Sequence, residues 1–256
     1  MKKSVIASAL MLIISTQLIC AVTFEKISGK RTFYMPNLST IMEEKAYEVH
    51  SFEFDFPFDG SNALKKHILL EVFGNKVGNT SSVNYATDKF LNTFLDEESN
   101  DRPQLISYTP EDSWAIQQVN ANGKLISQNS NLIVYEAQSY IYFAGAAHGM
   151  YGVSYLNYYT PSSKALKDTD ILLKSKKSLI DKAVRRNARK IADALYNPND
   201  FSGIEYSETF YISNKGITFV YQPYEIGPYS SGTIEITVPK SQLIGCLTTL
   251  GNKLIK

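Results

Sequence analysis

The stretch from Phe52 to Phe58, FEFDFPF, alternates strictly between phenylalanine and other residues. This period of two places the aromatic rings on one face and Glu53 and Asp55 on the other, which is typical of a half-buried β-strand. Pro57 has no backbone N–H and predicts the end of the strand. The sequence therefore requires a sheet with an aromatic face that another layer must cover.

Three segments have the apolar spacing of helices. The first, NALKKHILLEVF, follows Asp59-Gly60-Ser61, so that Asp59 or Ser61 is the expected N-cap. In the second, VNYATDKFLNTFL, residues 83–95, the apolar residues recur at helical intervals. The clearest is KSLIDKAVRRNARKIADALYN, residues 177–197, which Asn197-Pro198 should end.

The remaining periodic segments favour strands. Residues 114–119 and 124–127 flank Asn122-Gly123, a strong signal for a tight hairpin turn. Further strands are expected at 132–143, 153–159, 209–213, 217–221 and 233–239, followed by a closing helix from Lys240. The acidic segment DEESNDRP, residues 96–103, predicts an exposed connection.

This order predicts an α+β protein with two small mixed α/β domains, each a mainly antiparallel sheet packed with one or two helices. We place the boundary near Ser130, where SQNSN interrupts the strands. The expected organisation is a signal peptide at 1–21, an N-terminal companion domain at 22–130 and a C-terminal domain at 131–256.

The first 21 residues have the pattern of a signal peptide. Lys2 and Lys3 precede an uncharged, mostly apolar run from Val5 to Ile19, which is shorter than the roughly 20 residues of a membrane-spanning helix. We interpret the segment as directing export, with cleavage after Ala21 and no membrane span afterwards. Lipid attachment at Cys20 is the alternative. The protein is thus expected in the periplasm or outside the cell, free or as a lipoprotein.

Charge and cysteine content exclude several classes of function. Without Lys2 and Lys3, 24 of the 26 basic residues remain against 25 acidic ones, so the chain lacks the basic excess typical of a nucleic-acid binder. Cleavage would leave Cys246 as the only cysteine, which we expect to be buried and inert. No clustered His or Cys ligands predict a metal site, and no cofactor motif is present.

His148 lies in the loop sequence YFAGAAHGMYG, surrounded by alanine and glycine. Small neighbours allow a sharp turn or a close approach by another segment. A catalytic histidine needs a nucleophile or an orienting acid as its partner, and the sequence shows neither a nucleophile elbow nor a cysteine nucleophile. We interpret His148 as a residue whose ring pins a loop, and we assign no catalytic residue.

A second unusual segment is FVYQPYEIGPYSSG, residues 219–232. Pro223 and Pro228 stiffen the backbone of this segment, which should display the side chains Tyr221, Tyr224, Glu225 and Tyr229. Tyrosines on a rigid frame lose little entropy on binding and recur in recognition surfaces. Together with His148, these four residues are the predicted binding site. Closure of a sheet edge is the alternative role.

These motifs together carry a resemblance. A strand leading into Ala-His-Gly, then LNYYTPSSKALKDTDIL and the late tyrosine segment, resemble the C-terminal domain of the RsiV-like family over about residues 131–250. That family covers the extracytoplasmic part of the RsiV anti-sigma factor and the non-catalytic domains of PdaC-type deacetylases. The resemblance implies an envelope-facing sensory or binding module, directed at lysozyme or peptidoglycan.

Two activities of the family do not transfer to this sequence. Only Met1-Lys2-Lys3 precedes the apolar run, so we do not expect this chain to hold a sigma factor. Deacetylation by PdaC-type proteins belongs to a separate metal-binding domain, so we do not expect it of this chain either. The loop also has Ala146 where the family usually has glycine.

A basic stripe runs along the longest predicted helix, formed by Lys182, Arg185, Arg186 and Arg189. It is either an ordinary solvated face or a contact for an anionic partner.

Three functions follow as hypotheses. The leading one is a non-enzymatic cell-envelope binding protein, with lysozyme as a partner of the tyrosine segment. The second is a module that binds peptidoglycan or another glycan through the tyrosines between residues 135 and 159. The third is a hydrolase with His148 as general base and Glu225 as its orienting acid.

Overall fold

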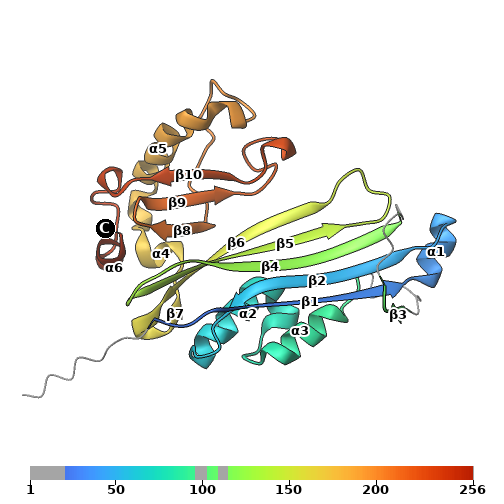
Figure 1. Ribbon diagram of the computed structural model, residues 1–256. Coiled ribbons are helices and arrows are strands. Elements are labelled where there is room, and N and C mark those ends of the chain that lie inside the picture. Colours follow the sequence, from blue (N-terminus) through green and yellow to red (C-terminus); the bar gives the residue numbers. More distant parts are fainter. Residues whose placement is uncertain (1–20, 96–102, 109–114, 256) are drawn as a thin grey trace, which may run out of the picture.

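The computed structural model describes residues 21–95, 103–108 and 115–255 (Figure 1). Residues 1–20 of the predicted signal peptide, Cys20 included, lie outside this range, as does nearly all of the acidic connection DEESNDRP. Within the described ranges, no helix combines the length and the apolar composition that crossing a bilayer requires.

A seven-stranded sheet forms the larger layer. Its strands, in spatial order, are β3 (Gln104–Ile106), β1 (Glu25–Tyr34), β2 (Tyr47–Phe56), β4 (Ile116–Gln128), β5 (Leu132–Tyr142), β6 (Met150–Tyr159) and β7 (Lys164–Ala165). Among the described strands, only β2 and β4 pair in parallel. A parallel pair needs a crossover connection, and the chain between these two strands includes α2 (Asn62–Gly78) and α3 (Val83–Leu91). The short helix α1 (Pro36–Met42) joins β1 to β2.

Helices α2 (Asn62–Gly78) and α3 (Val83–Leu91) cover one face of this sheet (Figure 1). The alternation in β2 is confirmed, because Phe52, Phe54 and Phe56 are buried beneath these helices while Glu53 is exposed. Ser61 caps α2 as predicted, its hydroxyl oxygen accepting a hydrogen bond from the N–H of Leu64. Burying the aromatic face of β2 is thus what holds the two helices on the sheet.

A smaller sheet lies beside β6 on the other side of the large sheet (Figure 1). It contains the antiparallel strands β8 (Phe210–Ser213), β9 (Gly216–Tyr221) and β10 (Ile234–Val238). Helix α5 (Lys177–Ala188) packs against it, and the short helices α4 (Asp168–Ile171) and α6 (Thr249–Leu254) lie near one end. The α+β class is confirmed. Cys246 is buried in the hydrophobic core between the smaller sheet and its helices.

The division at residue 130 stays a prediction. The structure places β4 and β5, which precede and follow that residue, side by side in the large sheet. The segment that follows β7 builds the smaller sheet and its helices.

The predicted hairpin at Asn122-Gly123 is wrong, because β4 runs without interruption through both residues. Gly123 is needed there for a different reason. A Cβ atom on it would lie 2.4 Å from the hydroxyl of Tyr135, whose ring packs over this position from the neighbouring strand. Tyr135 in turn donates a hydrogen bond of 2.9 Å to the carbonyl oxygen of Asp55.

Replacing Gly123 with alanine is therefore expected to destabilise the protein by about 1–3 kcal/mol, the usual cost of overpacking. The added methyl group would displace the Tyr135 ring and its hydrogen bond to Asp55. Chemical denaturation of the variant measures this loss. Gly203, around which an added Cβ would find open space, offers the matched control. Equal midpoints for the two alanine variants would contradict the explanation.

The long predicted helix at 177–197 is shorter than expected. The α-helix ends at Ala188 and continues as a 3₁₀-helix at Arg189–Ala194, within which Ile191 leaves helical geometry at φ −128°. The predicted closing helix also starts later, at Thr249 instead of Lys240.

Part of the basic stripe is used within the fold. Arg185 donates from Nε to the carbonyl oxygen of Ile204 at 2.8 Å, and the Arg189 guanidinium lies 5.7 Å from the centre of the Phe201 ring. Lys182 and Arg186 are exposed. Two of the four cations therefore hold the segment that leads to β8.

Two side-chain amides join the smaller sheet to β6. Asn157 of β6 is buried, donates to the carbonyl oxygen of Phe210 at 2.8 Å and accepts from the N–H of Ile212 at 2.9 Å. Gln222, just after β9, bonds both backbone groups of Val153. These contacts fix the loop that follows β9 against β6.

Candidate functional site

The two loops singled out in the sequence meet in the structure. The ring of His148, between β5 and β6, stacks on Tyr229, between β9 and β10, with a centroid distance of 4.2 Å. The Tyr229 hydroxyl donates to the carbonyl oxygen of Gly149 at 2.6 Å. His148 Nδ1 lies 2.9 Å from the same oxygen. His148 thus pins one loop against the other, as the interpretation from its small neighbours predicted.

Gly149 has no side chain and so leaves room for the ring of Tyr140. A Cβ on Gly149 would lie 2.4 Å from atoms of the Tyr140 ring, so any larger residue would push that ring away. Tyr140 and Tyr151 are neighbours on β5 and β6, and Tyr151 makes an edge contact of 5.7 Å with Tyr229. The glycine after His148 is therefore required by packing between tyrosines.

The segment from Gln222 to Gly232, which we call the tyrosine loop, is held at several points. Gln222 bonds β6, as described above, and the carbonyl oxygen of Ile226 accepts from the N–H of Tyr196 at 3.1 Å. Tyr224 has φ +73°, a left-handed conformation that bulky residues seldom adopt. Backbone strain of this kind concentrates at functional sites.

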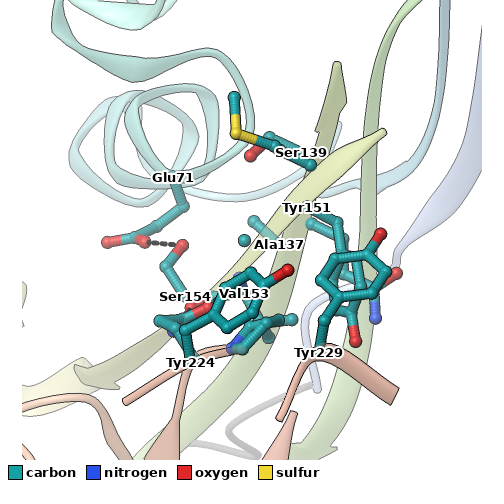
Figure 2. A pocket seen from close by; sticks show the side chains of 13 residues that line it. Glu71, Ala137, Ser139, Tyr151, Val153, Ser154, Tyr224 and Tyr229 are labelled. Atoms are coloured by element: carbon teal, nitrogen blue, oxygen red, sulfur yellow. Dashed lines mark hydrogen bonds between the residues drawn. The ribbon is translucent and has the colours of Figure 1, made fainter. Parts of the chain in front are cut away.

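A cavity of about 400 Å³ lies between the tyrosine loop, β6 and α2. Figure 2 shows Glu71 and Ser154 on one side, Tyr151 and Tyr229 on the other, and Tyr224 between them. We call this cavity the tyrosine pocket. Its lining is Glu71, Ala137, Gln138, Ser139, Met150, Tyr151, Gly152, Val153, Ser154, Gln222, Pro223, Tyr224 and Tyr229. Its volume and its mixture of aromatic and hydrogen-bonding groups are typical of small-molecule sites.

Glu71 is the one carboxylate in this lining, and the sequence analysis missed it. It accepts a hydrogen bond of 2.8 Å from the Ser154 hydroxyl, and burial raises the pKa of its carboxyl group while that bond partly opposes the rise. In the sequence, Glu71 is an ordinary helical glutamate within LLEVF. Only the packing of α2 beside β6 reveals its place in the pocket.

The predicted site residues are not all together. Tyr224 and Tyr229 line the tyrosine pocket, and His148 supports it from behind Tyr229. Tyr221 is not displayed as expected, because it is only 4% exposed and donates its hydroxyl hydrogen to the carbonyl oxygen of Glu205. Glu225 is exposed, and its carboxylate accepts from the N–H of Gln222 in its own loop.

The histidine and the glutamate of the hydrolase hypothesis do not form a pair. The His148 ring contacts the oxygen of Gly149 and, at 3.4 Å from Nε2, the hydroxyl of Tyr224. Neither contact involves Glu225, whose carboxylate bonds Gln222 instead. Among the described residues, no group of three His, Cys, Asp or Glu side chains is arranged to hold a metal ion.

Comparison with known proteins finds a family match for part of the chain. Residues 167–241 match the model of DUF3298, a protein family of unknown function. The DUF3298 match runs from just before α4 to just after β10 and so contains the tyrosine loop, while Glu71 and His148 lie before it. No curated protein matches the sequence.

Two crystal structures of DUF3298 family proteins share this fold. One, from Bacteroides fragilis NCTC 9343, is 20% identical, with a TM-score of 0.71 over 90% of this chain and 94% of that one. The other, from Pseudomonas aeruginosa PAO1, is 18% identical, with a TM-score of 0.62 over 89% of this chain and 95% of that one. At these identities the likeness concerns the fold alone. The resemblance to the RsiV-like family stays a prediction.

Proposed function

We propose that this chain is an exported, non-enzymatic binding protein of the cell envelope and that the tyrosine pocket binds a saccharide of the cell-wall type. The observation that carries the proposal is the convergence of Tyr151, Tyr224 and Tyr229 on one cavity. Flat aromatic rings stack on the apolar faces of sugar rings, and their hydroxyl groups keep polar edges for sugar hydroxyls.

Polar groups in the lining support the same ligand class. The lining also offers hydroxyl and amide groups from Gln138 and Ser139 on β5 and from Ser154 on β6. The tyrosine loop is already fixed by Gln222 and by the Tyr229 contact with Gly149, so little order must be created on binding. A preformed aromatic surface with adjacent hydrogen-bonding groups is well suited to bind a sugar ring.

Replacing Tyr224 with alanine is expected to weaken binding of peptidoglycan fragments about ten-fold, since one aromatic stacking contact contributes about 1.4 kcal/mol. Tyr224 is 55% exposed, so the fold should tolerate the change. Calorimetric titration of the mature chain with muropeptides measures the affinity. Tyr85→Ala is the matched control, because Tyr85 is 57% exposed on α3 and does not line the pocket.

Two results would contradict the saccharide assignment: no binding of muropeptides by the parent protein, or equal losses in the Tyr224 and Tyr85 variants.

Lysozyme is the second candidate partner, as the RsiV-like resemblance implies. The exposed Tyr224 and Glu225 favour it, because they present a ring and a carboxylate at the surface of the loop. Titration of the same variants with a C-type lysozyme distinguishes the two partners.

A further inference from the structure

Glu71, the carboxylate in the tyrosine pocket, forms no ion pair with any cation of the described residues. Its one hydrogen-bond partner is the Ser154 hydroxyl, and within the described part of the chain no lysine, arginine or histidine forms an ion pair with Glu71. None of the thirteen lining residues is basic. A desolvated carboxylate is costly to maintain, and a bound cation would offset that cost.

The aromatic groups around the same cavity suit a cation as well. The rings of Tyr224 and Tyr229 lie 5.6 Å apart at 33°, and Tyr151 meets Tyr229 at 64°. The three rings therefore differ in orientation, and an organic ammonium group is attracted to the faces of aromatic rings. Figure 2 shows Glu71 on one side of the pocket, Tyr151 and Tyr229 on the other, and Tyr224 between them.

We propose that the tyrosine pocket selects ligands that carry a protonated amine, with Glu71 as the counter-charge and the rings of Tyr151, Tyr224 and Tyr229 as the aromatic walls. This inference rests on the proposed function in taking the pocket as the ligand site. It adds that an amino sugar with a free amine binds more tightly than its N-acetylated counterpart. An anionic ligand would meet the Glu71 carboxylate with no basic residue to balance it.

The test compares two trisaccharides of equal length, the glucosamine trimer and the N-acetylglucosamine trimer, by calorimetry near pH 7. The parent protein is expected to bind the amine form at least about ten-fold more tightly, a difference of about 1.4 kcal/mol. Glu71→Gln should abolish this preference, because it removes the charge and keeps the size. Glu208→Gln, which neutralises an exposed carboxylate outside the pocket lining, should keep it.

A second pair of probes separates this inference from the saccharide proposal. Cadaverine carries two amines and pentanediol has hydroxyl groups in their place, and neither contains a sugar ring. Binding of cadaverine that depends on Glu71, without binding of either trimer, would support amine selection and overturn the saccharide assignment. Equal or tighter binding of the N-acetylated trimer, or a preference that survives in Glu71→Gln, would overturn amine selection alone. Failure of every probe would overturn both.

The Glu71→Gln variant should fold at least as well as the parent. Burial raises the Glu71 pKa above its ordinary value of 4.5, so the folded state favours the protonated carboxyl. The stability that this preference contributes is present below that value and is lost as the pH rises through the raised pKa. Near pH 7 the neutral glutamine avoids this loss, and thermal unfolding should show an equal or higher midpoint. Loss of amine binding with retained stability would exclude misfolding as the cause.

Discussion

Replacing Glu48 with alanine is expected to lower the free energy of unfolding by about 3–5 kcal/mol, because the loss of one buried carboxylate leaves three hydrogen-bonding groups without their acceptor. Glu48 and His50 are both fully buried on β2. One carboxylate oxygen lies 2.7 Å from His50 Nε2 and accepts from the N–H of Leu95 at 2.8 Å. The other oxygen accepts from the Gln117 amide at 3.2 Å.

The size of this effect comes from the groups that the substitution leaves behind. Alanine would remove the acceptor of the buried His50 ring, of the buried Gln117 amide and of the partly buried Leu95 N–H. The His50 ring is enclosed by Phe33, Phe90 and Phe94, with centroids 5.6–6.2 Å away.

Glu53 provides the control on the same strand. It pairs with Lys26 at 2.7 Å, but both side chains are more than half exposed, so Glu53→Ala should cost less than about 1 kcal/mol. Urea denaturation of both variants gives the comparison. If the Glu48 variant lost no more stability than the Glu53 variant, the buried network would contribute nothing beyond a surface pair.

The second large effect is expected for Asn157→Leu. The leucine has a similar size but leaves the carbonyl oxygen of Phe210 and the N–H of Ile212 without the partners that Asn157 supplies. An unsatisfied buried group costs about 1–3 kcal/mol, so the two together should lower stability by about 2–4 kcal/mol. Denaturation with both urea and heat would measure it.

Asn120→Leu is the matched substitution for Asn157. Asn120 lies on β4 in the same sheet, is only partly buried and accepts from the Ser51 hydroxyl at 2.9 Å. Its loss should cost less than about 1.5 kcal/mol, the net value of one ordinary hydrogen bond. Comparable losses of stability in both variants would show that the Asn157 amide, between β6 and β8, contributes no more than an ordinary hydrogen bond.

The sequence predicted correctly those structural features that depend on residues close together in the chain. The alternation in β2 and the cap at Ser61 were recognisable because each involves residues close together in the sequence. The Asn122-Gly123 signal misled because the reason for Gly123 lies on the neighbouring strand, under Tyr135. The helix after residue 177 was predicted too long because Ile191 leaves helical geometry despite its favourable spacing.

The candidate site was predicted in parts and not as a whole. The compositions of the His148 loop and the tyrosine loop identified each segment, but their contact joins residues about eighty positions apart. No periodicity encodes that contact. Glu71 and Gln222 could not be recognised either, because a glutamate on a helix and a glutamine beside a proline are common in any sequence. Their roles depend on how α2 and the smaller sheet pack on β6.

The edge of β6 on the side of β7 is also a place where two molecules of this protein could pair at high concentration. β7 pairs with only Tyr158 and Tyr159, so most of the strand has no neighbouring strand on that side. An open strand edge is a template for another chain and a starting point for fibrils. Gln222 occupies the N–H and the carbonyl oxygen of Val153 with its side chain, as a strand residue would. This side chain, together with the Asn157 contacts to β8, therefore covers part of the edge with which another chain would otherwise pair.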